Sequence, residues 1–79
     1  MTLRYDSEAD ALYLRLRDDL VWARTIELSE NVALDVSHDD QLIGIEVLAA
    51  SATVGNGQLP SLLVENLPED LVKVVQAAA

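Results

Sequence analysis

The chain of 79 residues contains no cysteine. This absence excludes disulfides, thiolate zinc sites and cysteine nucleophiles, and therefore also a small secreted scaffold held by disulfides. No apolar run approaches the roughly 20 residues that span a bilayer, and the first residues lack the apolar stretch of a signal peptide. We therefore expect a cytoplasmic protein that is neither exported nor inserted into a membrane.

Basic residues are scarce and gathered near one end. Residues 1–24 hold four arginines against five acids, a net charge of −1, whereas residues 25–79 hold Lys73 against nine acids, a net charge of −8. The total of −9 repels phosphate backbones and anionic lipid, and nucleic-acid binders usually concentrate Lys and Arg on one face. The charge predicts no nucleic-acid or membrane contact, and among protein partners it favours a basic one.

Nucleotide-binding signatures are also missing. Gly55-Asn56-Gly57 lacks the lysine and the following helix of a phosphate-binding loop, so we predict no cofactor. Hydrophobic residues make up 51% of the chain, which is enough for one core and favours a fold over disorder. We predict a single domain over residues 1–79 that is short enough to gain burial by forming a homo-oligomer.

Five short segments are predicted as strands: 2–5, 11–17, 20–28, 32–36 and 42–48. Alternation of apolar and polar residues marks the second, fourth and fifth, and β-favouring residues mark the third. The second also fits a helix, with Ser7 as its cap and Leu12 and Leu16 on one face. Its alternation continues through Arg17, which favours the strand. Because short turns join the segments, neighbours in sequence should pair as antiparallel hairpins. The predicted fold is α+β. Residues 1–50 form its β-region, in which the strands of an antiparallel β-meander span residues 2–49.

The rest of the chain predicts a linker over 51–59 and a C-terminal helical segment over 60–76 with one or two short helices. Pro68 suits the first turn of a helix, and an apolar stripe follows it. We expect the stripe to pack on the sheet or to bind a partner. The predicted partner-binding residues are Leu67, Leu71 and Val74.

The sole histidine, His38, stands between Ser37 and Asp39. A catalytic triad needs side chains that converge from separated positions, so this adjacency favours an exposed hairpin loop. Hard oxygen ligands make a metal site the sharper alternative, although the spacing does not fit a calcium-binding loop. We therefore predict no catalytic residue and no specific metal site, with weak metal candidates at Asp35, His38, Asp39 and Asp40.

Acidic residues in turns offer the remaining route to chemistry. Asp6 and Asp10 lie in the first turn, and Glu46 interrupts an apolar strand. A cross-strand ion pair of Glu46 with Arg15 or Arg17 is the structural explanation that we favour over a catalytic acid.

Four blocks of the sequence resemble a known family: YDSEADALYLRL at 5–16, RTIEL at 24–28, VALDV at 32–36 and LIGIEVL at 42–48. They are similar to the domain of unknown function numbered 2283, over roughly residues 1–51. The resemblance implies a small prokaryotic protein without an established activity, and an antitoxin-like or other partner-binding role.

Two functions follow as hypotheses. The first is a non-enzymatic protein-interaction module that acts as a homo-oligomer or with a protein partner. The second is a small metal-assisted enzyme that uses Asp6, Asp10, His38 or Glu46.

Overall fold

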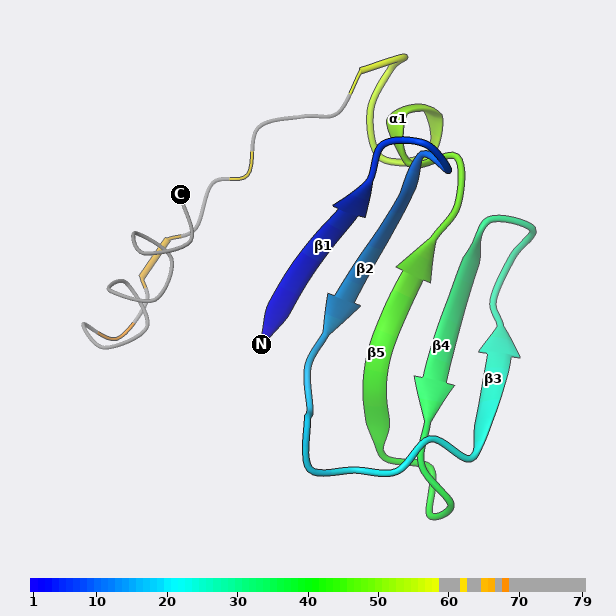
Figure 1. Ribbon diagram of the computed structural model, residues 1–79, viewed down its shortest axis with the longest axis vertical. Helices are drawn as coiled ribbons and strands as arrows, with labels where there is room; N and C mark the ends of the chain where they lie inside the picture. The colour runs from blue at the N-terminus through cyan, green and yellow to red at the C-terminus, as the bar shows by residue number, and fades with distance from the viewer. Residues whose placement is uncertain (59–61, 63–64, 67, 69–79) are drawn as a thin grey trace.

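The computed structural model describes residues 1–58, 62, 65–66 and 68. All neighbouring strands are antiparallel, and they form one sheet in the order β1-β2-β5-β4-β3 (Figure 1). The five-stranded antiparallel sheet predicted from the alternation is therefore confirmed. Its elements are β1 (Thr2–Asp6), β2 (Ala11–Arg15), β3 (Arg24–Glu27), β4 (Val32–Val36), β5 (Leu42–Val47) and the short helix α1 (Ala50–Thr53).

The strand order corrects the predicted meander. β2 does not pair with β3, which follows it in sequence, but with β5, and β3 lies at the far edge beside β4. The sheet is thus a hairpin of β1 and β2 joined to a meander of β3, β4 and β5. β5 holds Ile43, Ile45 and Val47 in alternation, and its central position gives these three side chains strand neighbours on both sides.

A crossover over residues 16–23 makes this order possible. The amides of Leu16 and Arg17 donate to the carbonyl of Ile43 at 2.8 and 3.2 Å, and the amide of Ala23 donates to that of Val36 at 2.9 Å. The chain thus passes the ends of β5 and β4 before β3 begins (Figure 1). The strand predicted over 20–28 is therefore shortened to Arg24–Glu27.

Local side-chain bonds define the first turn. The Asp6 carboxylate accepts from the amides of Glu8 and Ala9 at 3.0 and 3.3 Å, as expected of an Asx turn. Asp10 then adopts a left-handed φ of 50°, and the chain enters β2. The helical alternative for residues 7–16 is wrong, because Ala11–Arg15 is a strand.

One short helix is described after the sheet. α1 occupies Ala50–Thr53, at the start of the predicted linker 51–59. The helical segment predicted over 60–76 falls mainly outside the described residues.

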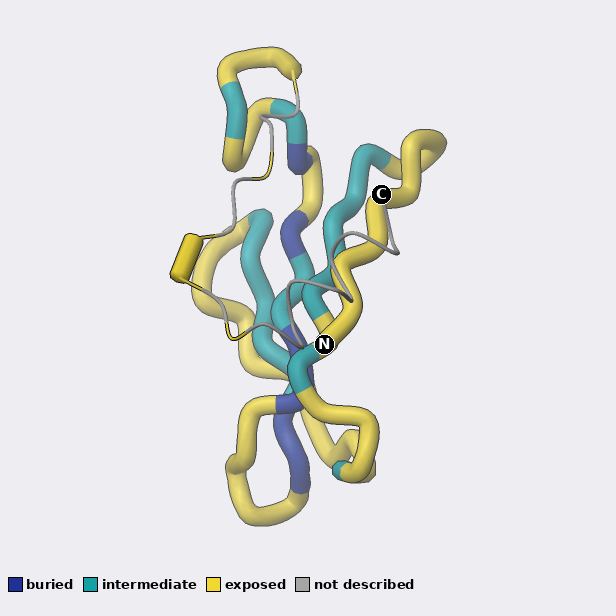
Figure 2. The backbone as a smooth tube through the Cα atoms, turned by 90° about the vertical axis from the view of Figure 1, so that its left-hand side faces the viewer, coloured by how far each residue is buried: buried dark blue, intermediate teal, exposed yellow. Residues whose placement is uncertain are grey.

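The buried apolar residues are few and lie on the inner strands and at the start of α1. Val36, Ile43 and Val47 are 4%, 2% and 8% exposed, and Ala50 is fully buried. Figure 2 shows the strands as a twisted layer with the buried positions along its centre. The described chain therefore forms one layer, whereas most domains bury a sheet face under a second layer.

Candidate functional site

The register places nearly all apolar strand residues on one side of the sheet. The register pairs Leu14 with Ile45, Ile45 with Leu34, and Leu34 with Ile26. Because side chains alternate along each strand, the residues two positions away from these lie on the same side. We call this side the apolar face. Its residues are Leu3, Tyr5, Leu12, Leu14, Ile26, Val32, Leu34, Val36, Ile43, Ile45 and Val47.

The apolar face is incompletely covered. Leu3, Tyr5 and Ile26 on the edge strands are 44%, 40% and 37% exposed. α1 lies beyond one end of the sheet (Figure 1), and within the described part of the chain the principal contacts between elements are those of neighbouring strands. Large apolar side chains gathered on one face and left open to water are characteristic of an interaction surface.

The opposite side, which we call the polar face, carries a connected row of hydrogen bonds. The hydroxyl of Tyr13 donates to Asp35 Oδ2 at 2.8 Å, and the hydroxyl of Thr25 donates to Asp35 Oδ1 at 2.7 Å. The indole of Trp22 donates to the Thr25 oxygen at 3.0 Å. The row links β2, β4, β3 and the crossover, and it passes over β5 at Gly44.

Gly44 allows this row to form. An added Cβ at Gly44 would lie against the Tyr13 hydroxyl, 2.6 Å from its Cζ and 2.9 Å from the carbonyl oxygen of Leu14. The tyrosine ring thus crosses the glycine to reach Asp35 two strands away. Burial of the hydroxyl and its bond to Asp35 raise the pKa of Tyr13, so the phenol stays protonated at neutral pH and acts as a donor.

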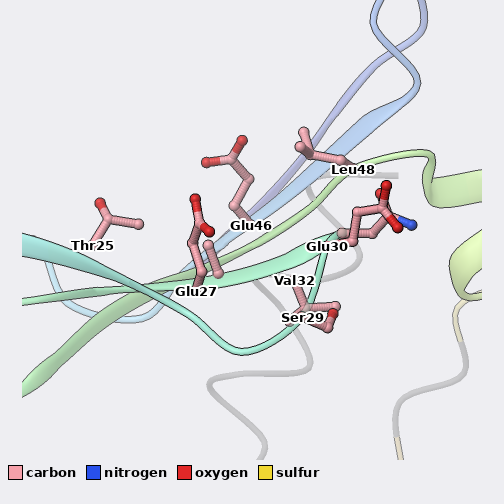
Figure 3. A pocket seen from close by; sticks show the side chains of 9 residues that line it. Thr25, Glu27, Ser29, Glu30, Val32, Glu46 and Leu48 are labelled. Carbon is pink, nitrogen blue, oxygen red and sulfur yellow. The ribbon is translucent and has the colours of Figure 1, made fainter.

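A shallow hollow lies on the polar face where β3, β4 and β5 run together. Glu27 and Glu46 flank the small Ala33 in register, and Figure 3 shows both carboxylates on the same side of the sheet, with Glu30 farther along the turn. Glu46 lies opposite Tyr13 on its other side. The hollow is acidic and open to solvent.

The predicted ion pair of Glu46 with Arg15 or Arg17 is wrong. Among the described residues, Arg15 pairs with Asp18 at 3.6 Å and Arg17 pairs with Asp19 at 2.6 Å. Both arginines therefore pair with acids of the crossover over residues 16–23. The Arg17 bond lowers the pKa of Asp19 to about 2.

Of the four weak metal candidates, Asp35 lies on β4 and the other three lie in the β4–β5 turn, and the three acids have different bonding partners. Asp35 joins the polar-face row, whereas Asp39 accepts from Ser37 at 2.7 Å and from Gln41 at 2.8 Å within the β4–β5 turn. The last acid of the turn pairs with an arginine of β3 (Arg24–Asp40). His38 is exposed in the same turn. Across the described ranges, no three His, Asp or Glu side chains are placed to hold a metal ion.

Asp10, a candidate acid, connects distant parts of the chain. Its carboxylate accepts from the hydroxyl of Ser51 at 2.6 Å and from the hydroxyl of Tyr5 at 2.7 Å, and its carbonyl accepts from the amide of Ala50 at 2.8 Å. The bonds from Ser51 and Tyr5 lower the pKa of Asp10. These bonds of Asp10 connect α1 to the hairpin of β1 and β2. Asp6, the other candidate acid of this turn, stabilises the turn by accepting bonds from the backbone amides of Glu8 and Ala9.

The predicted partner-binding residues Leu67, Leu71 and Val74 lie outside the described residues. Sequence reasoning missed both the Tyr13–Asp35 row and the Asp10–Ser51 bond. A glycine inside a strand signals close approach of another group, and Gly44 was such a signal. No helix in the described part of the chain is long and apolar enough to cross a membrane.

The profile of the family described as Protein of unknown function (DUF2283) matches residues 2–51. This range covers more than half of the chain. The chain belongs to this family. The DUF2283 match begins with β1 and ends at Ser51, the residue that bonds Asp10. No curated protein and no solved structure matches the chain.

The DUF2283 range therefore coincides with the sheet and the first two residues of α1. The early and late blocks that carry the resemblance are neighbours in space, because β2 pairs with β5. The bond between Asp10 and Ser51 joins the first turn to the last residue of the matched range. Both faces of the sheet belong to the shared domain.

Proposed function

We propose that this domain is a non-enzymatic protein-interaction module whose docking surface is the apolar face. The observation that carries the proposal is the exposure of Leu3, Tyr5 and Ile26, at 37–44%, on a face formed almost entirely of apolar side chains. Removing apolar surface from water stabilises by about 25 cal/mol per Å². A protein that covers this face gains that free energy without any change of fold.

The bonds of the polar face support a structural role for its titratable groups. Asp35 accepts from both Tyr13 and Thr25, so its two oxygens are engaged in joining strands. An active site needs a nucleophile, base or acid aimed at a substrate position, whereas these groups are aimed at each other. The proposal therefore places function on the apolar face and cohesion of the sheet on the polar face.

The proposed setting is the cytoplasm, and the proposed partner is a protein, either a second copy or another chain. An antitoxin-like role, in which the domain covers a small toxin-like protein, is one form of this function. Such a role needs a stoichiometric complex. The toxin-like protein would therefore have to cover the apolar face, as any other protein partner would.

The test compares two variants with matched charge changes. Leu3→Lys/Ile26→Lys adds two positive charges to the apolar face, whereas Thr2→Lys/Glu27→Gln changes the charge by the same amount on the other side of the same two strands. Each tagged full chain is expressed in its native cells and purified at moderate salt. Bound proteins, including untagged copies, are identified and quantified by mass spectrometry.

We expect a stoichiometric protein to stay with the wild-type chain and with the polar-face variant, and to be lost from the apolar-face variant. A charge on a buried apolar contact is costly because it loses water without gaining a partner. Circular dichroism of both variants checks that each keeps the sheet. Purification of the wild-type chain alone, as a monomer, would contradict the proposed function.

A further inference from the structure

The apolar face needs an occupant, and the shared domain contains none. The family match ends at Ser51 and holds five strands and two residues of α1. α1 has four residues and lies at the end of the sheet, where it buries Ala50. A sheet is stable when its apolar face lies under a second layer. Residues 2–51 of one copy supply no such layer, so if these residues cover the face, they belong to a second copy.

The distribution of charge favours the same occupant. The strand residues of the apolar face include no acid, and Arg24, at the end of β3 on this side, pairs with Asp40 of the turn. A basic partner would therefore find no carboxylate within the face. A surface that is mostly apolar is complemented by another such surface, and a second copy of the chain would supply one.

The acids of β3, β4 and β5 do not oppose this packing. Glu27, Asp35 and Glu46 lie on the polar face, which points outward when two apolar faces meet. Sheets packed face to face are about 10 Å apart, so the outward carboxylates of two copies are about 20 Å apart. This distance exceeds the screening length of about 8 Å at physiological salt.

The size of the face suits a reversible dimer. Five strands spaced about 4.8 Å apart give a width of about 24 Å, and five residues per strand give a length of about 17 Å. The flat area of about 400 Å² per copy, or about 800 Å² for both copies, is smaller than the roughly 1,200 Å² of a standard stable interface and corresponds to weak association. For a weak, reversible dimer we expect a dissociation constant in the micromolar range.

We propose that a second copy of this chain covers the apolar face, so that two five-stranded sheets pack face to face as a β-sandwich. This inference rests on the proposed function and names its partner. Leu3 and Ile26, which are half-exposed in the single copy, are buried in the dimer. Residues 59–79 of the same chain and a different protein are the competing occupants.

The first experiment measures the mass of the purified full chain by sedimentation equilibrium from about 1 to about 200 micromolar, which brackets the expected dissociation constant. We expect the mass to rise from 8.6 kDa to twice that value. Leu3→Lys/Ile26→Lys should weaken the dimer by about 100-fold or more, because each interface then buries four unpaired charges. Thr2→Lys/Glu27→Gln should leave it unchanged.

The matched variants also separate face packing from edge pairing. All four substituted positions lie on the edge strands β1 and β3, so a dimer that adds strand to strand would respond alike to changes on either side. A loss confined to the apolar-face variant supports the inference. An equal response of both variants overturns it.

A charge-swap experiment removes the ambiguity of a variant that folds poorly. Leu3→Glu/Ile26→Glu is prepared beside Leu3→Lys/Ile26→Lys, and each should be monomeric alone. Mixing them should restore a 1:1 heterodimer, because lysines of one copy then face glutamates of the other. Mixtures that remain monomeric, while the wild-type chain dimerises, would overturn the inference.

The remaining outcomes distinguish this inference from the proposed function. A wild-type chain that stays monomeric up to about 200 micromolar overturns the second-copy inference and leaves the face to residues 59–79 or to another protein. If a different protein then co-purifies from native cells and is lost from the Leu3→Lys/Ile26→Lys variant, the proposed function stands without the dimer. If no protein is bound in either experiment, both fail.

Discussion

The two faces of the sheet use the same strands in opposite ways. The apolar face holds Leu, Ile and Val side chains that make non-directional contacts, and Leu3 and Ile26 at its edges remain open to water. The polar face holds directional bonds, in which Tyr13, Asp35 and Thr25 satisfy each other across the strands. Contacts of the first kind are available to a second molecule, whereas bonds of the second kind are already made. We propose that this difference separates a surface for binding from a surface that joins the sheet.

The largest effect is expected from filling the space at Gly44. Gly44→Ala places a methyl group against the Tyr13 ring and within 2.9 Å of the Leu14 carbonyl oxygen, so one of them must shift. We expect a loss of about 1–3 kcal/mol in the free energy of unfolding, as for other overpacked sites. Urea denaturation measures the loss.

A second substitution identifies the cause of that loss. In a Tyr13→Ser background, Gly44→Ala should cost less, because the ring no longer occupies the space above β5. The difference between the two backgrounds gives the coupling of the two residues. Equal costs in both backgrounds would show that the polar-face row does not depend on the missing side chain.

A smaller effect is expected from removing single hydroxyl groups from each face. Tyr13→Phe keeps the ring but removes the bond to Asp35, and we expect a loss of about 1 kcal/mol in the free energy of unfolding. Tyr5→Phe, on the apolar face, removes the more exposed bond to Asp10 and should cost less. The same denaturation experiment compares them. A larger loss for Tyr5→Phe would contradict the ranking of the two bonds by their exposure.

The smallest effect concerns pH. The hydrogen bonds of Ser51 and Tyr5 lower the pKa of Asp10 below its ordinary value of 3.8. A carboxyl group with a lowered pKa contributes stability that is present above its ordinary value and is lost as pH falls through the lowered one. Asp10→Asn should therefore be less stable than the wild-type chain at neutral pH, and the gap should narrow below pH 3.8.

Thermal unfolding across this range measures the gap. Glu8→Gln is the control, because it removes a charge from the same turn where the described structure shows no hydrogen bond to the side chain of Glu8. Its melting temperature should follow that of the wild-type chain at every pH. A gap between wild type and Asp10→Asn that stays constant down to pH 2 would rule out the Asp10–Ser51 bond as its source.

The sequence by itself determined the strands, because alternation with a period of two is a local property that each segment carries alone. It predicted β4 over 32–36 without error, and it assigned Leu14, Leu34 and Ile45 to one side of their strands. Family membership was also accessible, since the blocks that carry it lie within single strands and turns.

Only the tertiary structure decided which strands are neighbours. The placement of β5 between β2 and β4 depends on how the apolar residues of all five strands share one face, and no local pattern records that sharing. The same placement brings Tyr13 over Gly44 to Asp35, and Asp10 to Ser51. These partners are 22 and 41 residues apart in sequence, so their pairing follows from the packing of the sheet and could not be predicted from spacing.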